Sequence, residues 1–330
     1  MNNNLKKILG IIIAIGVLAF GTIFVYTKYN EVPIEYQKFN EYGITYEYNE
    51  NYEDYGDKYF YNQLDELEKI YYQCFYNTSK NLDVKFEINC EFDDTKATRA
   101  WQAFQADFSE FYWWSSWTQE YRFLENSLSK QFPYSFIVAT GYAKMDVVDA
   151  YPKIEEKAKE IINEVKTDDD FETIKNLHDY IVLNTKYDEE SVANQNIRSV
   201  FLFNESVCAG YAQAFQYVSN MMGYECYSIT GKVVPYDDES LHEWNIIRLN
   251  DNWYWVDTTW DEVYDGNGKE IGVSNDYLFL DDEILLIDHK PDEYFDLPAC
   301  EDKSLFYLND AGAYFDTYDV KQIEKKMKEL

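Results

Sequence analysis

The residues around Cys208 constrain the fold of this chain most. Phe215, Val218 and Met222 follow the cysteine at helical spacing. Gly223 ends the pattern. The sulfur is therefore expected at a helix N-terminus, where free N–H groups and the helix dipole favour a thiolate over a thiol. A nucleophilic thiolate needs a base, and the base needs a group that orients it, so the chain must supply both near this helix end.

Two stretches downstream of this helix indicate strands. Residues 241–249 and 253–259 are rich in aromatic and β-branched side chains. Asn250 and Asp251 between them are typical of a two-residue hairpin turn. The sequence therefore predicts an antiparallel hairpin in which each strand carries one polar residue of interest.

A two-residue turn sets the register of this hairpin. It pairs Leu249 with Asn252, and side chains alternate faces along each strand. His242 and Asp257 then lie on one face as diagonal neighbours, within reach of each other. A three-residue turn would break this parity. With a two-residue turn, chain geometry predicts a constellation of Cys208, His242 and Asp257.

These residues resemble the transglutaminase-like superfamily, relatives of papain whose core runs cysteine, histidine, aspartate. The matching segments are Leu177–Val182, Val207–Ala212, His242–Asn245 and Trp253–Asp261. Ala209 departs from the pattern, because many bacterial relatives carry an acidic residue there. The resemblance implies an α+β fold whose core packs a nucleophile helix on an antiparallel sheet. It also implies Cys208 as nucleophile, His242 as general base and Asp257 as the group that orients it.

Acyl transfer by a thiolate needs hydrogen-bond donors for the developing oxyanion. The backbone N–H of Cys208 is one candidate. Gln195 is the second, because related cysteine enzymes carry a donor residue upstream of the nucleophile. The alternative for Gln195 is an ordinary polar loop residue.

Aromatic side chains near the triad are candidates for the substrate groove. They are Tyr211, Trp244 and Trp260, each of which could instead fill the core. His178 lies on the apolar face of a helix and is expected to be a buried structural residue, and His289 is expected to be structural in a loop outside the triad. No metal site is expected, because the acidic residues 261, 262 and 265 match no EF-hand spacing. No cofactor is implied either, since the protein supplies the nucleophile.

Charge and length bound the possible partners. The chain has 330 residues and a net charge of −32, which argues against nucleic acid and against adhesion to anionic surfaces. Residues 8–26 form an apolar run without charge after Lys6 and Lys7, as expected of a single membrane-spanning anchor. A cleaved signal peptide is the alternative. Either places the rest of the chain outside the cytoplasmic membrane, at the cell membrane or secreted.

The expected organisation has five parts. They are an anchor at 1–30, an acidic tyrosine-rich tether at 31–57, a small α+β domain at 58–145, the catalytic core at 146–296, and a hairpin with a terminal helix at 297–330. In the small domain, helices are expected at 64–76 and 98–107 and strands at 84–92 and 135–142. In the core, helices are expected at 147–165 and 171–184 and further strands at 224–234 and 277–280.

The chain has five cysteines, an odd count for an oxidising compartment. With Cys208 as the free nucleophile, the other four allow three disulfide pairings or isolated buried thiols. These four are Cys74, Cys90, Cys226 and Cys300.

The function expected from this resemblance is that of an extracytoplasmic cysteine enzyme. It would act on peptide or protein carbonyl or carboxamide groups through a thioacyl intermediate, which passes to water or to an amine. The alternative is a catalytically silent surface module of the same fold that binds peptide or glycan.

Overall fold

A computed structural model describes the backbone of residues 44–45, 56–88, 92–122, 134–191, 194–234, 240–264 and 270–306. The apolar run at 8–26, Cys90, Asp265 and the expected helix near the C-terminus lie outside these residues. Among the helices that are described, none combines the length and the apolar character that a membrane crossing requires.

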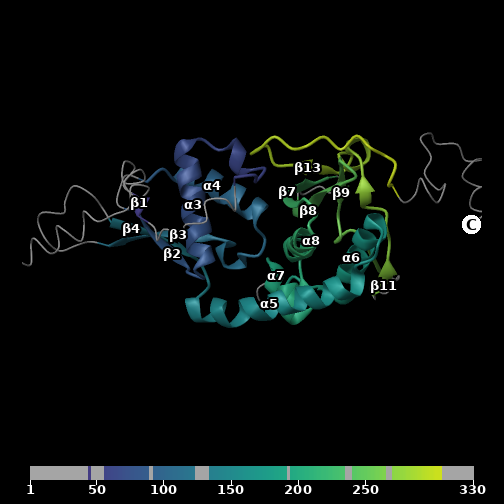
Figure 1. Ribbon diagram of the computed structural model, residues 1–330, viewed down its shortest axis with the longest axis horizontal. Coiled ribbons are helices and arrows are strands. Elements are labelled where there is room, and N and C mark those ends of the chain that lie inside the picture. Colours follow the sequence, from purple (N-terminus) through teal and green to yellow (C-terminus); the bar gives the residue numbers. More distant parts are fainter. Residues whose placement is uncertain are drawn as a thin grey trace, which may run out of the picture.

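The described residues between 44 and 139 form a small domain of two α-helices and a four-stranded antiparallel sheet that includes β1 (Ile44–Thr45), at the left of Figure 1. Its elements are η2 (Tyr61–Gln63), α3 (Glu66–Lys80), β2 (Lys85–Ile88), α4 (Asp94–Asp107), η3 (Tyr112–Trp114), β3 (Trp117–Arg122) and β4 (Tyr134–Ala139). The sheet order is β1-β2-β4-β3. Each expected element of this domain is present, and β3 is an addition that the sequence did not indicate.

Aromatic side chains form the interior of the small domain. The segment that precedes β3 contributes a run of buried rings, including Trp113 and Trp114, both fully buried. Phe75 of α3 contacts Trp114 edge to face, with ring centroids 5.0 Å apart. Helix α3 begins with a capping box, in which Asp65 and Glu68 satisfy each other's backbone N–H groups.

Strand β1 (Ile44–Thr45) lies within the segment 31–57 that was expected to be a tether. It pairs antiparallel with β2, Ile44 opposite Ile88. The tether therefore supplies hydrogen-bond partners to an edge strand that would otherwise be open.

The core packs helices against a five-stranded antiparallel sheet (Figure 1). Its helices are α5 (Lys144–Val165), α6 (Asp170–Asn184), α7 (Ile197–Phe203), α8 (Cys208–Met222) and α9 (Asp282–Leu285). The sheet has the order β12-β9-β8-β7-β13, from strands β7 (Cys226–Val233), β8 (Ser240–Leu249), β9 (Asn252–Val256), β12 (Leu278–Leu280) and β13 (His289–Pro291). The core also has two separate two-stranded sheets. One pairs β5 (Lys186–Tyr187) with β6 (Glu205–Ser206), and the other pairs β10 (Glu262–Tyr264) with β11 (Glu270–Val273).

The hairpin register is the one that the sequence predicts. Leu249 pairs with Asn252, and both Asn250 and Asp251 have positive φ, as a tight mirror-image turn requires. Strand β9 is shorter than expected, because it ends at Val256. The N–H of Asp257 instead donates to the carbonyl of Tyr277 at 2.9 Å, which turns the chain away from β8.

The two domains are joined by direct contacts as well as by the long helix α5, which runs along the lower edge of Figure 1. Trp113 of the small domain contacts Tyr151 of α5, with ring centroids 5.9 Å apart. Gln216 of α8 donates to the carbonyl of Ala106 at 2.6 Å. The nucleophile helix therefore touches the small domain as well as its own sheet.

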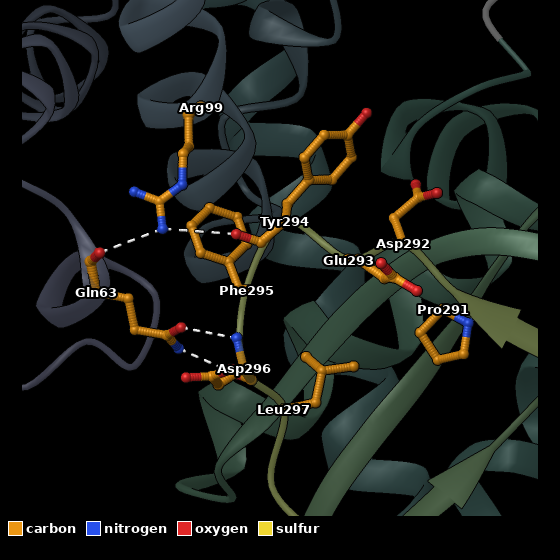
Figure 2. Close-up of a pocket in the computed structure, with 9 residues that line it drawn as sticks. All are labelled: Gln63, Arg99, Pro291, Asp292, Glu293, Tyr294, Phe295, Asp296 and Leu297. Atoms are coloured by element: carbon orange, nitrogen blue, oxygen red, sulfur yellow. Dashed lines mark hydrogen bonds between the residues drawn. The ribbon is translucent and has the colours of Figure 1, made fainter.

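The chain after β13 forms a further interdomain contact, which borders a hollow of about 550 Å³ (Figure 2). The side-chain amide of Gln63 donates to the carbonyl of Asp296 and accepts from the N–H of the same residue. The guanidinium of Arg99 lies 4.9 Å from the centre of the Phe295 ring. We name residues 291–297 the crossing segment, since they belong to the core and pack on the small domain.

Candidate active site

The predicted pair of His242 and Asp257 is formed. The Nε2 atom of His242 lies 2.6 Å from Oδ2 of Asp257. Both side chains are buried. The remaining ring nitrogen, Nδ1, is left for the nucleophile. The tight turn between β8 and β9 brings the two residues to one face, as the parity argument requires.

Cys208 is the first residue of α8, and Val207 caps the helix in an extended conformation. The thiol is partly exposed. The helix can start so close to its neighbours because residue 210 is glycine: a Cβ there would lie 1.9 Å from Oγ of Ser206 and 2.7 Å from Oγ of Ser199. The nucleophile therefore sits at a helix end packed against α7 and β6.

Electrostatics connect the three residues. Burial lowers the pKa of His242, but Asp257 and then Cys208 outweigh it through charge and hydrogen bonds and raise that pKa to about 10. Burial raises the pKa of Asp257, and the charges and hydrogen bonds of His242 and His289 outweigh it, so that this pKa falls well below its usual range. The raised pKa of His242 favours a protonated imidazole beside Cys208.

Asp257 has a full set of donors. Oδ1 accepts the backbone N–H groups of Thr259 and Trp260, at 2.9 and 3.3 Å. Oδ2 faces a second histidine as well as His242, since Nε2 of His289 lies 3.0 Å away. Sequence reasoning placed His289 outside the triad, and this contact was missed because it depends on the short strand β13, which had no sequence signal.

Among the described residues, His242, Asp257 and His289 form one cluster of metal-ligand type, with ligand atoms within 4.8 Å of one another. The Nε2 atoms of both histidines are directed at the same carboxylate oxygen at hydrogen-bond distance. The three residues therefore hold one another and form a hydrogen-bonded network.

The site opens into a cleft of about 1040 Å³ between the two domains. Cys208, His242 and Glu243 line it from the core. Side chains of the small domain form the facing wall, among them Phe60, Trp101, Gln102, Gln105 and Ser116. The crossing segment borders both this cleft and the smaller hollow of Figure 2. The candidate catalytic groups Cys208 and His242 thus face a groove that neither domain builds alone.

Gln195 lines the cleft beside Cys208 and is exposed. Its neighbour Asn194 accepts the N–H of Val207 at 3.1 Å, which fixes this turn to the residue before the nucleophile. The position is compatible with a donor to an oxyanion, while the Nε2 atom of Gln195 now lies 3.4 Å from Oδ1 of Asn194.

The three aromatic residues expected in the groove do not line the cleft. Tyr211 is fully buried, and its hydroxyl donates to the carbonyl of Thr185 at 2.7 Å. Trp244 is also fully buried, stacked on His242. Trp260 packs on His289, with ring centroids 4.6 Å apart. Trp244 and Trp260 pack on the two imidazoles, whereas Tyr211 lies beside Tyr187.

Glu243 is a cleft residue that sequence reasoning missed. It follows His242 in β8 and therefore points to the opposite face, toward α8, where Gln213 donates to it at 3.0 Å. Burial raises the pKa of Glu243 to about 7, against hydrogen bonds from Gln213 and Ser228 that lower it. In the sequence, the one feature that could have pointed to Glu243 is its position next to His242.

His178 is buried as expected and supports the site from behind. Nδ1 lies 2.9 Å from Oδ1 of Asp179, and Nε2 makes an ion-pair contact of 2.9 Å with Oδ2 of Asp261. Burial lowers the pKa of His178, and the two carboxylates raise it above its ordinary value. Asp261 also accepts the N–H groups of Asp276 and Tyr277. It therefore anchors the loop that follows Asp257.

The other cysteines that the structure describes do not line the cleft. Cys226 and Cys300 are free and buried, and burial raises the pKa of both. Cys74 is buried in α3. A Cys226–Cys300 disulfide, one of the pairings that the sequence left open, is absent.

Known proteins share this segment of the chain. Residues 155–258 match the family model of the transglutaminase-like superfamily. The kyphoscoliosis peptidase of Mus musculus is 22% identical over 169 residues, which cover 46% of this chain and 26% of the relative. The Homo sapiens protein is 22% identical over 165 residues, 45% of this chain and 24% of the relative. The chain thus spans about a quarter of the length of these curated relatives.

Solved structures show the same kind of similarity. A TGase crystal structure is 12% identical, covers 58% of this chain and 55% of its own, and superposes with a TM-score of 0.31. A candidate cysteine protease from Cytophaga hutchinsonii is 13% identical, covers 48% of this chain and 66% of its own, and gives a TM-score of 0.30. Because these superpositions are loose, the assignment rests on the family model: residues 155–258 of this chain are a transglutaminase-like domain.

Proposed function

We propose that this chain is a cysteine enzyme that acts on peptides or proteins through a thioacyl intermediate on Cys208. One observation carries the proposal: Nε2 of His242 lies 2.6 Å from Oδ2 of Asp257, Cys208 raises the pKa of the same imidazole, and both His242 and Cys208 line a cleft. This is the arrangement that generates a thiolate and keeps an acid beside it.

The first half of the reaction follows from these positions. The Cys208 thiolate attacks the carbonyl carbon, and the C=O electron pair moves to oxygen. The N–H of Cys208, at the start of α8, and the side chain of Gln195 are the donors proposed for this oxyanion. When the C–N bond breaks, the imidazolium of His242 gives its proton to the leaving amine.

The second half restores the enzyme. Water or a primary amine attacks the thioacyl carbon, and neutral His242 takes a proton from it. The C–S bond breaks and the thiolate returns, with acid or amide as product. The partition between hydrolysis and amine transfer is set by which acceptor occupies the cleft.

The cleft also supports a substrate preference. Glu189, Glu243 and Asp292 line it, against one ammonium group, that of Lys232. An acidic lining attracts basic side chains and repels acidic ones. We propose basic peptides as the preferred substrates.

The test uses the purified full-length chain and peptide amides that carry lysine or glutamate beside the scissile group, with and without an added primary amine. Mass spectrometry should show acid product alone without amine, amide product with it, and faster turnover of the basic peptides. Cys208→Ala is the control. A wild-type chain that forms no thioacyl adduct and whose Cys208 is not labelled rapidly at pH 6 would contradict the proposal.

A location outside the cytoplasmic membrane also belongs to this proposal. It rests on the apolar run at 8–26 behind Lys6 and Lys7, which favours an anchor with its N-terminus inside. External protease should cleave the chain on intact cells. Cleavage only after permeabilisation would contradict this location.

A further inference from the structure

His289, in the edge strand β13, is buried between two carboxylates. Its Nε2 atom is 3.0 Å from Oδ2 of Asp257, and its Nδ1 atom is 2.6 Å from Oδ1 of Asp288. The imidazole is fully buried. Both ring nitrogens therefore depend on these two carboxylates for their hydrogen bonds.

The donors and acceptors determine the charge of this ring. An ionised carboxylate only accepts hydrogen bonds, and a neutral imidazole has one N–H and one bare nitrogen. A bare nitrogen would face a carboxylate oxygen lone pair to lone pair. Asp257 accepts two backbone N–H groups besides the histidines, and Asp288 accepts the hydroxyl of Tyr277 at 2.8 Å, so both are placed as ionised acceptors. From this geometry we infer that His289 donates from both nitrogens, as an imidazolium does.

The charges of the site then alternate along a chain of five groups. In order they are the thiolate of Cys208, the imidazolium of His242, the carboxylate of Asp257, the imidazolium of His289 and the carboxylate of Asp288. The last of these reaches solvent, with 23% of its side chain exposed. The buried charges of the triad are thus balanced by a path that ends at the surface.

The second imidazolium changes what Asp257 does for the first. A carboxylate shared by two cations holds each less firmly than a carboxylate with one partner. The rings of His242 and His289 are also close enough to repel, with centroids 5.6 Å apart. His289 therefore fixes the position of Asp257 and makes His242 release its proton more readily.

The sheet is built so that His289 can reach this place. A Cβ at Gly231 in β7 would lie 2.3 Å from the carbonyl oxygen of Lys290 and 2.6 Å from the Trp244 ring, so only glycine lets β13 approach this closely. The ring of Trp260 covers His289 at a centroid distance of 4.6 Å, and that of Trp244 at 4.9 Å.

We propose that His289 is a positioning residue of the catalytic triad, which holds Asp257 opposite His242 and, balanced by Asp288, eases the transfer of the His242 proton to the leaving group. This inference rests on the proposed function, because it assigns a role in the same thiolate chemistry.

The inference is tested by a pH profile. Other ionisable groups that face the two imidazoles can also shape this profile. They are Cys208, Glu243, Asp257, Tyr277 and Asp288, with Tyr187 close to Cys208 and Asp257. Glu243 titrates near pH 7, and burial raises the pKa of Tyr187 to about 12. The alkaline limb near pH 10, where His242 loses its proton, is therefore the limb to follow.

The experiment measures the rate at which iodoacetate labels Cys208 in the full-length chain from pH 5 to 11. Iodoacetate is an anion, so its attack is helped by the imidazolium and slows when His242 is deprotonated. His289→Gln removes the charge and keeps a donor toward Asp257. We expect the alkaline limb to move up by about one pH unit. Asp288→Asn should move it the same way, and the double variant no further than His289→Gln.

His178→Gln is the matched control, because His178 is also buried between two carboxylates, those of Asp179 and Asp261. The alkaline limb of the Cys208 labelling profile in His178→Gln should stay at the wild-type pH. An alkaline limb that stays or moves down in folded His289→Gln, checked by circular dichroism, overturns the inference. If that variant does not fold, Asp288→Asn decides in its place. A wild-type chain without rapid labelling at pH 6 overturns the proposed function instead.

Discussion

The side-chain amide of Gln213 donates a hydrogen bond to the carboxyl group of Glu243, with 3.0 Å between Nε2 and Oε1. Gln213 lies on the nucleophile helix, and Glu243 follows the base His242 in β8. The contact therefore ties the two halves of the site together. It also holds a carboxyl group whose pKa burial raises to about 7.

The Glu243→Gln variant is expected to lose less folding stability than wild type as the pH rises. The folded-state pKa lies above the ordinary value of 4.5, so folded chains bind this proton more tightly than unfolded ones. The stability from protonated Glu243 is full below about pH 4.5 and is lost as pH rises through about 7. Urea unfolding should show that the free energy of unfolding of wild type falls by on the order of 2–3 kcal/mol as the pH rises through this range. The variant should not show this fall. Equal pH slopes for both proteins would contradict this.

His178→Gln should cost most stability at low pH. The folded-state pKa of His178 is raised above 6.5 by Asp179 and Asp261 against the effect of burial. Its contribution is therefore complete below about pH 6.5 and is lost as pH rises through the folded-state value. We expect a cost of about 3 kcal/mol at pH 6 and less at pH 9, measured by denaturant unfolding. A cost that grows with pH would show that the histidine is neutral in the folded chain.

Gly210→Ala is expected to displace the start of the nucleophile helix. The new Cβ would lie 1.9 Å from Oγ of Ser206, so Ser206 or the helix must move. The expected cost is about 1–3 kcal/mol of stability, with slower labelling of Cys208 by iodoacetamide. Gly272→Ala is the control, because a Cβ at Gly272 meets no atom within 4 Å. Unchanged labelling in Gly210→Ala would show that the helix end tolerates the added methyl group.

Arg99→Lys should loosen the crossing segment. The guanidinium of Arg99 covers the ring of Phe295 (Figure 2). It also pairs with Glu68 at 2.6 Å, and an ammonium group cannot do both. We expect a loss of about 1 kcal/mol, seen as faster hydrogen exchange in residues 291–297. Arg248→Lys, which changes a half-exposed arginine paired with Glu225, should leave exchange in this segment unchanged. Equal exchange rates of residues 291–297 in both variants would show that the contacts of Arg99 do not stabilise this segment.

Local patterns predicted the hairpin and its polar pair. Asn250 and Asp251 encode a turn by their tolerance of positive φ, and the parity of a strand then places His242 and Asp257 without knowledge of the rest of the fold. The helix that carries Cys208 was equally local, because Gly223 ends it in a left-handed conformation.

Contacts between distant segments could not be predicted in this way. His289 reaches Asp257 through a three-residue strand whose partner, β7, lies more than fifty positions earlier in the chain. Tyr211, Trp244 and Trp260 are aromatic, as groove residues often are, but Tyr211 and Trp244 are fully buried and Trp260 packs on His289. Position along a strand determines which face a side chain takes, but only the packing of the whole sheet decides which face meets substrate.

The two-walled cleft links catalysis to the assembly of the protein. One wall comes from residues between 60 and 116 and the other from residues between 187 and 297. A ligand that fills the cleft binds only when the domains are docked, so occupancy and docking stabilise each other. Each tenfold rise of ligand concentration above its Kd adds about 1.4 kcal/mol to the docked form. If the proposed activity is present, its turnover therefore reports on the integrity of a domain that holds none of the proposed catalytic groups.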